Sequence, residues 1–522
     1  MSAMRAPVFR LCSLRQPASV ALLSVLAAAL GFGCEDNSTP AAPNVVRLGI
    51  LSGLDGTTEP CGCTSKPLGG LDRLAAVVEG LQKKGPFRLL VAGNTLVSHA
   101  DPPAHLFDQE RAKARTIAEL LQKFAPLAMA LGPKAAGVQN TYVRSLLEKY
   151  ELPAFRQPST PTTRRRADSV ITRLGGIKIG VVGMPHRVRG EASSYTVRAN
   201  YLRQNGAQLV VALLPVGGTA ARQFVGQIDG VDVAVAGGAA DVHSPRMVKG
   251  TLLVEAGDRG RYLGVLELHR IDPESADWVY DDRGAARRRA LTARIGRLEK
   301  AVGRLPSGPA KKARQNKLTT LRQKLSNFNP PEPQGNHVTW AARPITQNIQ
   351  PTRTAAAALE AYNDALCNIA KRATADRECA AAPTEKARYV GTERCRACHS
   401  AAFEVYTNTA HAHAWATLEN AGKDCDPTCI GCHTVGFEKP GGFCRLADAP
   451  DYANVGCENC HGPGSGHVQN PTQPEAWASA FEPKPSEPTC VECHNPEHSD
   501  TFAFSEYLPN VLGPGHGEPL ER

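Results

Sequence analysis

The pattern Cys-x-x-Cys-His occurs four times near the C-terminal end of this 522-residue chain. The four copies are Cys395/Cys398/His399, Cys429/Cys432/His433, Cys457/Cys460/His461 and Cys490/Cys493/His494. Two cysteines at this spacing can each form a thioether with a haem vinyl group, and the histidine that follows can reach the iron. Zinc knuckles and disulfide frameworks also use paired cysteines. Neither of them requires a histidine directly after the second cysteine of each pair. The pattern therefore predicts four covalent haem c groups, with the four motif histidines as proximal iron ligands.

The sequence around these motifs, including YVGTERCRACH, HAHAWATLE and VGCENCHGPGSGH, resembles the tetrahaem cytochrome c family of nitrifying bacteria. In that family most irons carry two histidines, and one iron can lack the second. The resemblance favours His411 and His467 as distal ligands, and it pairs His467, expected in a Gly-rich loop, with the first haem. The other nearby histidines, His413, His498 and His516, are further candidates for distal ligands. For these three the alternative is a surface position without a role as ligand.

Residues 1–33 have the composition of an export signal, in which three arginines precede an apolar run too short to span a membrane. The segment Gly31-Phe32-Gly33-Cys34 resembles a bacterial lipobox, which predicts lipidation of Cys34, with plain secretion as the alternative. Residues 34–43 would then be a polar tether. We therefore expect the protein in the bacterial periplasm or at the outer membrane.

Six cysteines remain once the leader, the lipidation site and the haem motifs are set aside: Cys61, Cys63, Cys367, Cys379, Cys425 and Cys444. An exported protein meets oxidising conditions, which favour disulfides. We expect local pairs, Cys367 with Cys379 and Cys425 with Cys444. Cys61 and Cys63 could pair in a strained ring or bind a metal.

Residues 44–275 have an α/β pattern, in which apolar runs such as VVRLGIL, IKIGVVGMP and AQLVVALLP alternate with helical stretches. Runs that are apolar throughout indicate strands buried on both faces, and therefore a layered sheet covered by helices. The segments EPCGC, PLGGLDR, LLVAGNTL and VDVAVAGG resemble the calcineurin-like metallophosphoesterases of the 5'-nucleotidase branch.

That family binds two metals through an Asp-x-His, a Gly-Asp, a Gly-Asn-His, a lone His and a Gly-His-x-His, because carboxylate, amide and imidazole groups suit such cations. The matching positions in this chain are Gly53 and Asp55, Asn94, Gly132-Pro133-Lys134, Val216 and Gly237-Gly238-Ala239-Ala240. We therefore expect the fold without phosphoesterase activity. A site rebuilt from His99, Asp241 and His243 is the alternative.

Residues 280–330 carry apolar residues at helical spacing among many lysines and arginines, which predicts a basic helical hairpin. A linker helix is expected within 350–384, followed by a mostly helix-and-loop haem domain at 385–500 and a tail at 501–522. Residues 385–522 hold 9 basic and 19 acidic side chains, whereas the whole chain has a net charge of +10. The hairpin could therefore dock on its own haem domain, on an acidic redox partner or on anionic lipid.

Together these features predict an exported multihaem cytochrome c that carries electrons to or from other cytochromes or a periplasmic oxidoreductase. The phosphoesterase-like domain would be an inactive scaffold or docking surface. The alternative is a redox enzyme that acts on a small nitrogen or sulfur compound at a five-coordinate haem. A metal-dependent phosphoesterase is less favoured because its ligands are replaced, and nucleic-acid binding is not expected.

Overall fold

A computed structural model describes the protein over residues 45–60, 67–138, 140–155, 168–238, 242–329, 333, 335–375, 377–380, 387–495 and 498–516. The predicted leader, Cys34, the tether, Cys61, Cys63 and residues 239–241 lie outside these ranges. Within them, no helix combines the length and the apolar character that a membrane span requires.

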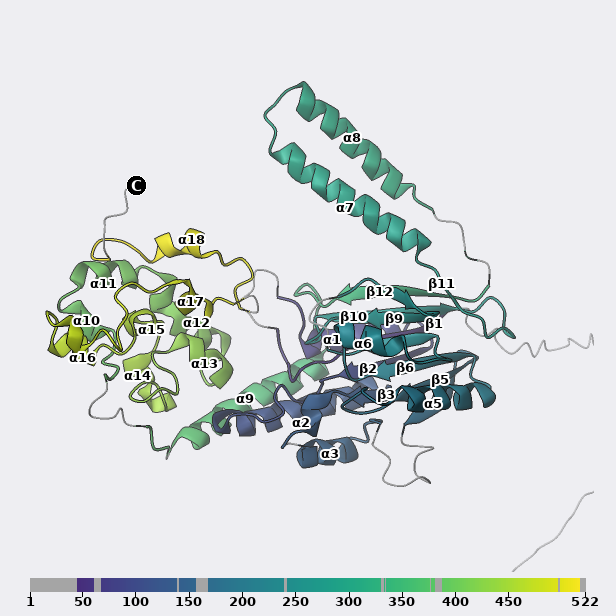
Figure 1. Cartoon of the computed structure of the whole chain (residues 1–522), viewed down its shortest axis with the longest axis horizontal. Helices are drawn as coiled ribbons and strands as arrows, with labels where there is room; N and C mark the ends of the chain where they lie inside the picture. Colours follow the sequence, from purple (N-terminus) through teal and green to yellow (C-terminus); the bar gives the residue numbers. More distant parts are fainter. Residues whose placement is uncertain are drawn as a thin grey trace, which may run out of the picture. The chain divides into compact units, whose positions relative to one another are not determined.

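The first sheet of the α/β domain has six strands in the order β11-β12-β10-β1-β2-β3 (Figure 1). Strands β1, β2 and β3 are parallel, and β10 runs antiparallel to both β1 and β12. The bounds are β1 (Val45–Leu51), β2 (Phe87–Gly93), β3 (Pro126–Leu131), β10 (Tyr262–His269), β11 (Val279–Tyr280) and β12 (His337–Pro344).

The second sheet also has six strands, in the order β4-β5-β6-β7-β9-β8. Its central strands β5, β6, β7 and β9 are parallel, and β4 and β8 pair antiparallel at the two edges. The bounds are β4 (Ser169–Leu174), β5 (Ile177–Gly183), β6 (Leu209–Leu214), β7 (Val233–Ala236), β8 (Arg246–Val248) and β9 (Thr251–Glu255).

The two sheets pack face to face around an apolar core that includes Leu48 and Ile50 from the first sheet and Val211 from the second. Helices α1 (Leu71–Gln82), α2 (Phe107–Phe124), α3 (Asn140–Lys149) and α9 (Arg353–Ala375) cover the other face of the first sheet. Helices α5 (Ala192–Gln204) and α6 (Gly218–Val225) cover the second. The predicted layered α/β fold is confirmed.

The basic segment forms a hairpin of α7 (Arg283–Gly303) and α8 (Pro309–Ser326). Ile295, Leu318 and Leu321 are buried between the two helices, which accounts for the narrow apolar stripe in the sequence. The hairpin connects β11 to β12, so it is inserted between two strands of the first sheet. The α/β domain predicted at 44–275 thus gains two strands from beyond residue 275.

The haem region is built from short helices joined by loops, as the sequence predicted. Its longest helices are α11 (Ser400–Thr407) and α12 (Ala414–Ala421), and its buried apolar cluster includes Leu418, Ile430 and Phe443. The other α-helices are α10 (Glu393–Arg396), α13 (Pro427–His433), α14 (Ala449–Tyr452), α15 (Cys457–His461), α16 (Ser465–Gln469), α17 (Glu487–Val491) and α18 (Phe504–Tyr507).

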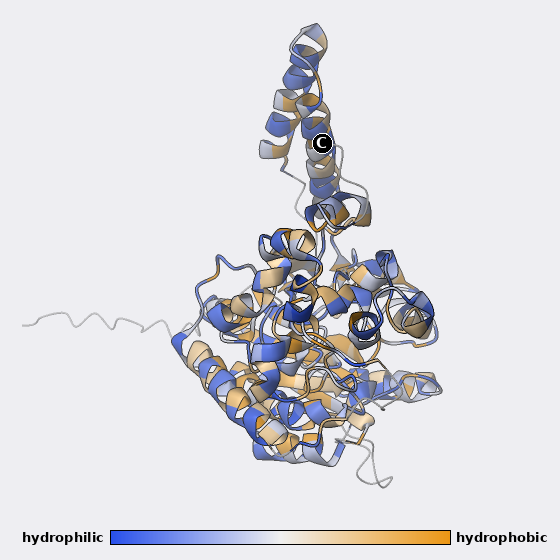
Figure 2. Ribbon diagram, turned by 90° about the vertical axis from the view of Figure 1, so that its left-hand side faces the viewer, coloured by the Kyte–Doolittle hydropathy of each residue, from blue (hydrophilic) through white to orange (hydrophobic). Residues whose placement is uncertain are grey.

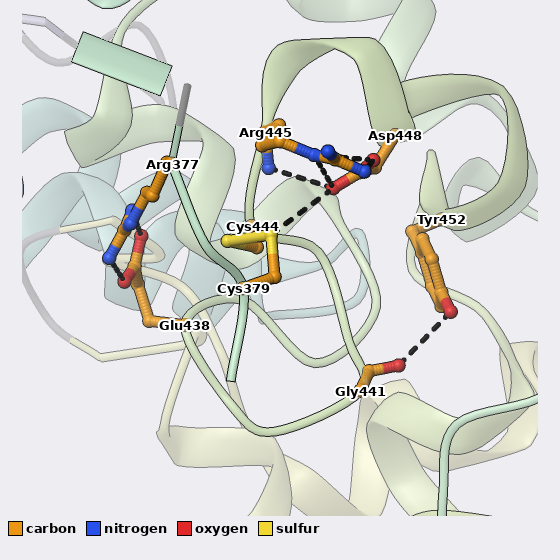
Figure 3. The surroundings of a disulfide bond; sticks show 8 residues. All are labelled: Arg377, Cys379, Glu438, Gly441, Cys444, Arg445, Asp448 and Tyr452. Atoms are coloured by element: carbon orange, nitrogen blue, oxygen red, sulfur yellow. Dashed lines mark hydrogen bonds and ion pairs between the residues drawn. A yellow bond between two sulfur atoms is a disulfide. The ribbon is translucent and has the colours of Figure 1, made fainter. Parts of the chain in front are cut away.

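The predicted local disulfides are wrong, because Cys367 bonds to Cys425. Cys379 bonds to Cys444, as Figure 3 shows. Cys367 lies in α9, which continues to Ala375. At 1.5 Å per residue this part of the helix is about 12 Å long, whereas bridged Cα atoms lie within about 7 Å. The rigid helix therefore keeps Cys367 away from Cys379, and both disulfides instead fix α9 and the segment after it to the haem region.

Polar contacts accompany these disulfides. The Gln109 side chain on α2 donates a hydrogen bond of 2.7 Å to Asp426, and Lys423 donates to Glu59 and to Asn363 on α9. Arg377 and Glu438 form a two-point ion pair close to the second disulfide (Figure 3). The haem region is thus held to α2 and α9 by covalent and polar links together.

Candidate haem sites

Each Cys-x-x-Cys-His motif forms about one turn of helix. The backbone N–H of His399 donates to the carbonyl of Cys395 at 2.9 Å, and that of His494 donates to Cys490 at 2.8 Å. The second and third motifs lie within α13 and α15. Residues three and four apart share one face of a helix. The two cysteines and the histidine of each motif can therefore bind the same haem group.

Cysteines from different motifs lie beside one another, and none of the eight forms a disulfide. Hydrogen bonding with Cys457, together with burial, raises the pKa of Cys395 far above its usual range. Contact with Cys432 and burial do the same to the pKa of Cys493. Burial, helped by nearby Cys490, raises the pKa of Cys460 to about 11. These contacts arrange the motifs in space in the order first, third, fourth, second.

Two pairs of histidine rings lie close to each other. The ring centroids of His399 and His467 are 6.0 Å apart with planes 30° apart, and those of His411 and His494 are 6.0 Å apart with planes 41° apart. Two metal–nitrogen bonds of about 2 Å each fit between imidazole rings at this separation. Each pair combines a motif histidine with one of the two distal candidates that the family resemblance favoured.

Three histidines of these pairs, His411, His467 and His494, sit where the neutral imidazole is favoured. Burial lowers the pKa of His494, and burial followed by the proximity of His494 lowers the pKa of His411. Burial, then His399 and His461, lowers the pKa of His467. The neutral ring is the form that binds a metal.

His516 lies close to the first and third motifs. Burial is the main cause of its lowered pKa, followed by the proximity of His461 and then of His399. Among the residues that the structure covers, the Nδ1 atoms of His467 and His516 are buried without a hydrogen-bond partner. Buried polar atoms without partners are rare in folded proteins, so both rings suit the role of ligand.

Two other motif histidines are oriented through their Nδ1 atoms. His433 Nδ1 lies 2.6 Å from the carbonyl oxygen of Ala414, and His461 Nδ1 lies 2.8 Å from that of Glu482. Metal-binding histidines commonly donate their second ring nitrogen to a carbonyl in this way, which leaves Nε2 for the metal. In contrast, the exposed His413 uses Nε2 in a contact of 3.1 Å with the carbonyl of Thr407.

His467 lies in the short helix α16, not in the flexible loop that its glycine-rich neighbourhood suggested. The Glu458 carboxylate accepts a hydrogen bond of 2.7 Å from the N–H of Gly464, just before this helix. Trp477 and Phe481 pack on the His467 ring, with centroids at 4.8 and 5.0 Å. These contacts fix a segment whose sequence alone predicts mobility.

The sequence alone did not predict a role for Glu458, although this residue holds the His467 segment and two of the motifs in place. Its side chain is 2% exposed and also accepts hydrogen bonds from the N–H groups of Val390 and Gly391, before the first motif. Burial raises the pKa of Glu458, while the backbone bonds from Gly464, Val390 and Gly391 oppose that shift. A single carboxylate thus joins the first motif, the third motif and the His467 segment. A carboxylate between two motif cysteines, followed by a glycine-rich segment, is the sequence signal for it.

In the α/β domain, the loops that the sequence resemblance matched to the phosphoesterase metal site meet at the ends of the strands. The Asn94 side chain accepts a hydrogen bond of 3.1 Å from the N–H of Lys134, and the Lys134 ammonium group lies 2.7 Å from the Asp55 carboxylate. Gly238 N–H donates to the Ser52 carbonyl at 3.0 Å. A lysine side chain therefore neutralises the acidic group at this position.

The alternative site from His99, Asp241 and His243 gains no support. His99 lies 3.4 Å from Glu110 and His243 lies 3.4 Å from Glu255, so the two histidines pair with separate carboxylates, and Asp241 is outside the described residues. Within the described ranges, no three or more His, Cys, Asp or Glu side chains form a group that could hold a metal ion.

Comparison with known proteins defines a class for the haem region. Residues 394–462 match the family described as "Cytochrome c554 and c-prime". This stretch contains the first three motifs and His411, and a c-type cytochrome family implies covalently bound haem c. The comparisons therefore support a multidomain protein with a cytochrome c region.

Among individual proteins, the chain is similar to cytochrome c-554 of Nitrosomonas europaea. The two are 36% identical over 91 residues, which is 15% of this chain and 39% of that protein. The similarity thus covers well under half of the relative's length, so it describes a region and not the whole chain.

The solved structures that resemble the chain include 5'-nucleotidases and a calcineurin-like phosphoesterase. A 5'-nucleotidase precursor from Thermus thermophilus has a TM-score of 0.43 at 15% identity and covers 76% of this chain and 71% of its own. A putative 5'-nucleotidase from Staphylococcus aureus has a TM-score of 0.40 at 13% identity, with 79% and 70% covered. A calcineurin-like phosphoesterase from Bacillus subtilis has a TM-score of 0.40 at 11% identity, with 62% and 97% covered. At these scores no activity or residue role is carried over to this chain.

Proposed function

We propose that this chain is an exported electron carrier with four haem c groups. Eight cysteines would hold them: Cys395, Cys398, Cys429, Cys432, Cys457, Cys460, Cys490 and Cys493. The observation that carries the proposal is the close approach of two pairs of imidazole rings, His399 with His467 and His411 with His494. Two histidines on one iron suit electron transfer, because they occupy both axial positions and exclude small molecules.

The geometry supports a specific set of axial ligands. His399 and His467 would bind the first iron, His494 and His411 the fourth, and His461 would bind the third. His516, which lies near His461, is the candidate for the second ligand of the third iron. His433 would be the proximal ligand of the second iron, with His498 as the remaining distal candidate.

The contacts between cysteines of different motifs support a continuous path for electrons. Haem groups attached to neighbouring thiols would lie side by side in the order first, third, fourth, second. The protein would set the potentials through its axial histidines and through burial. Redox proteins such as other cytochromes or a periplasmic oxidoreductase are the expected partners.

The remaining parts of the proposal concern export and the α/β domain. An exported chain, lipidated at Cys34, agrees with two disulfides, since such bonds persist in oxidising compartments. The Asp55–Lys134 ion pair, in place of metal ligands, supports a scaffold or docking domain without hydrolytic activity.

Replacement of His467 by alanine tests the ligand set. His467→Ala should convert one low-spin iron to high spin in the EPR spectrum, and the reduced protein should gain a carbon monoxide band. The matched control is His413→Ala, which removes an exposed histidine from the same region and should leave both spectra unchanged. If the EPR spectrum of His467→Ala is unaltered and no carbon monoxide band appears, the proposed assignment of axial ligands is wrong.

A second candidate function is reduction or oxidation of a small nitrogen or sulfur compound at the second haem. The observation in its favour is that three distal candidates are taken up by the first, third and fourth motifs, so the iron at His433 has the fewest candidates for a second ligand. Cyanide or nitric oxide should shift the Soret band of the wild-type protein if this iron is five-coordinate. An unshifted band would favour His498 as the ligand and electron transfer alone.

A further inference from the structure

The α7–α8 hairpin concentrates positive charge to a degree that no other segment matches in the sequence. Residues 283–326 contain 14 lysines and arginines and a single acidic residue, Glu299, which gives a net charge of +13. Twelve of these basic side chains are exposed: Arg287, Arg288, Arg289, Arg294, Arg297, Lys300, Arg304, Lys312, Arg314, Lys317, Arg322 and Lys324. The ribbon of both helices is blue over much of its length, which marks hydrophilic residues, with orange apolar positions between them (Figure 2).

The apolar residues of the hairpin pack against one another. Ile295, Leu318 and Leu321 are buried between α7 and α8, and Leu291, Leu298 and Leu325 pack beside them. A partner with an apolar face would therefore find little to bind on the outer surface. Such a surface suits a partner that offers many negative charges.

The root of the hairpin lies at the same end of the first sheet as the start of β1. Val45 is paired with His269, His269 with His337, and His337 with Val279. Neighbouring strands are about 4.8 Å apart, so Val45 and Val279 are separated by three strand spacings, or about 14 Å. The chain therefore enters β1 and begins β11, which leads into the hairpin, at the same end of the first sheet.

Ten residues, 35–44, separate Cys34 from Val45. Fully extended, they span at most about 35 Å, and the 21 residues of α7 span about 31 Å. A lipid on Cys34 would therefore keep the basic hairpin within reach of the head groups into which that lipid inserts. Tethering of this kind raises the effective concentration of the second contact.

We propose that the α7–α8 hairpin docks on the anionic head groups of the membrane that carries the Cys34 lipid, and thereby fixes the orientation of the α/β domain on that surface. Clusters of lysine and arginine bind anionic lipids through charge attraction, and a lipid chain with a basic patch makes a two-part anchor. A redox partner is less well matched to this surface, because the hairpin carries no haem motif. The choice of surface rests on the proposed lipidation, whereas the affinity of the hairpin for anionic lipid does not.

Vesicle sedimentation of the full-length Cys34→Ser chain, which cannot accept the lipid, isolates the hairpin. We expect it to sediment with vesicles of phosphatidylcholine mixed with phosphatidylglycerol and to be released from them at high salt. It should not sediment with vesicles of phosphatidylcholine alone. The additional substitutions Lys312→Glu, Lys317→Glu and Lys324→Glu should weaken this binding by at least about tenfold. The matched control, Arg115→Glu, Arg144→Glu and Lys149→Glu on α2 and α3, makes the same charge change and should bind like its parent.

Three outcomes would overturn the proposal: no sedimentation of the Cys34→Ser parent with phosphatidylglycerol vesicles, equal binding of the hairpin variant and its control, or hairpin-dependent self-association without vesicles. The last would point to the acidic haem region of a second copy as the true occupant. Unchanged far-UV circular dichroism and Soret spectra check the fold of each variant. Failure of lipidation is a separate result, visible as missing acyl mass on the wild-type chain, and it leaves the vesicle comparison intact.

Discussion

The α/β domain and the haem region achieve their folds by different means. In the α/β domain, side chains such as Leu48, Ile50 and Val211 are fully buried between two sheets and their covering helices. In the described part of the haem region, the buried apolar cluster consists of Leu418, Ile430 and Phe443. Two disulfides fix this region to α9 and the segment that follows it, and the buried Glu458 joins the first motif, the third motif and the His467 segment. The comparison indicates that apolar packing supports the first region, and cofactors with cross-links support the second.

The largest effect is expected when a haem is removed. Cys457→Ala with Cys460→Ala should leave three haems and unfold the haem region, because the third motif lies between the first and the fourth. The α/β domain should keep its own calorimetric transition. Haem content and calorimetry measure both effects, and Glu475→Ala, an exposed change in the same region, serves as the control. If the variant keeps a folded haem region, then the haem groups do not support its fold, and the proposed difference between the two regions is wrong.

Loss of a disulfide should come next in size. The bonds Cys367–Cys425 and Cys379–Cys444 close segments with sequence separations of 58 and 65. Closure of loops of this length stabilises a protein by about 4 kcal/mol. Cys367→Ser with Cys425→Ser should therefore destabilise the haem region by that amount in denaturant titrations followed at the Soret band. If the denaturant midpoint at the Soret band does not change, the polar contacts alone are sufficient to hold the haem region in its fold.

A core substitution should affect the α/β domain alone. Leu48→Ala removes a fully buried side chain between the sheets and should destabilise this domain by about 3 kcal/mol. The control is Ile171→Ala at a position that is 37% exposed, where the loss should be below about 1 kcal/mol. Far-UV circular dichroism reports the loss. If the Soret midpoint falls equally, the two regions unfold as one unit and the comparison fails.

The same contrast explains what the sequence could predict. Apolar runs such as LVVALL in β6 are buried along their whole length, so the layered fold follows from composition. In the haem region the motifs predicted the chemistry, but the disulfide partners depended on the rigid length of α9, and the helix around His467 depended on Glu458. Such tertiary contacts have no periodic signature in the chain. The ion pair between Asp55 and Lys134 could not be predicted from the sequence either, because 79 positions separate the two residues.

The smallest effect is expected at the position of the phosphoesterase metal site. The Lys134 and Asp55 side chains are 34% and 19% exposed, and partly exposed ion pairs contribute below about 1 kcal/mol. Lys134→Ala should therefore change the stability of the α/β domain little. Neither wild type nor variant should hydrolyse p-nitrophenyl phosphate when manganese or zinc is added. Metal-dependent turnover that disappears in His243→Ala would restore the hydrolytic interpretation.

The intact mass of the matured protein tests the proposed cofactor content most directly. Covalent attachment survives denaturation, so the mass counts occupied motifs without regard to the fold. The account predicts the mass of the processed chain plus four haem groups. A mass that corresponds to two or three haems would show an idle motif and interrupt the proposed order of electron transfer, and a mass without haem would contradict the account entirely.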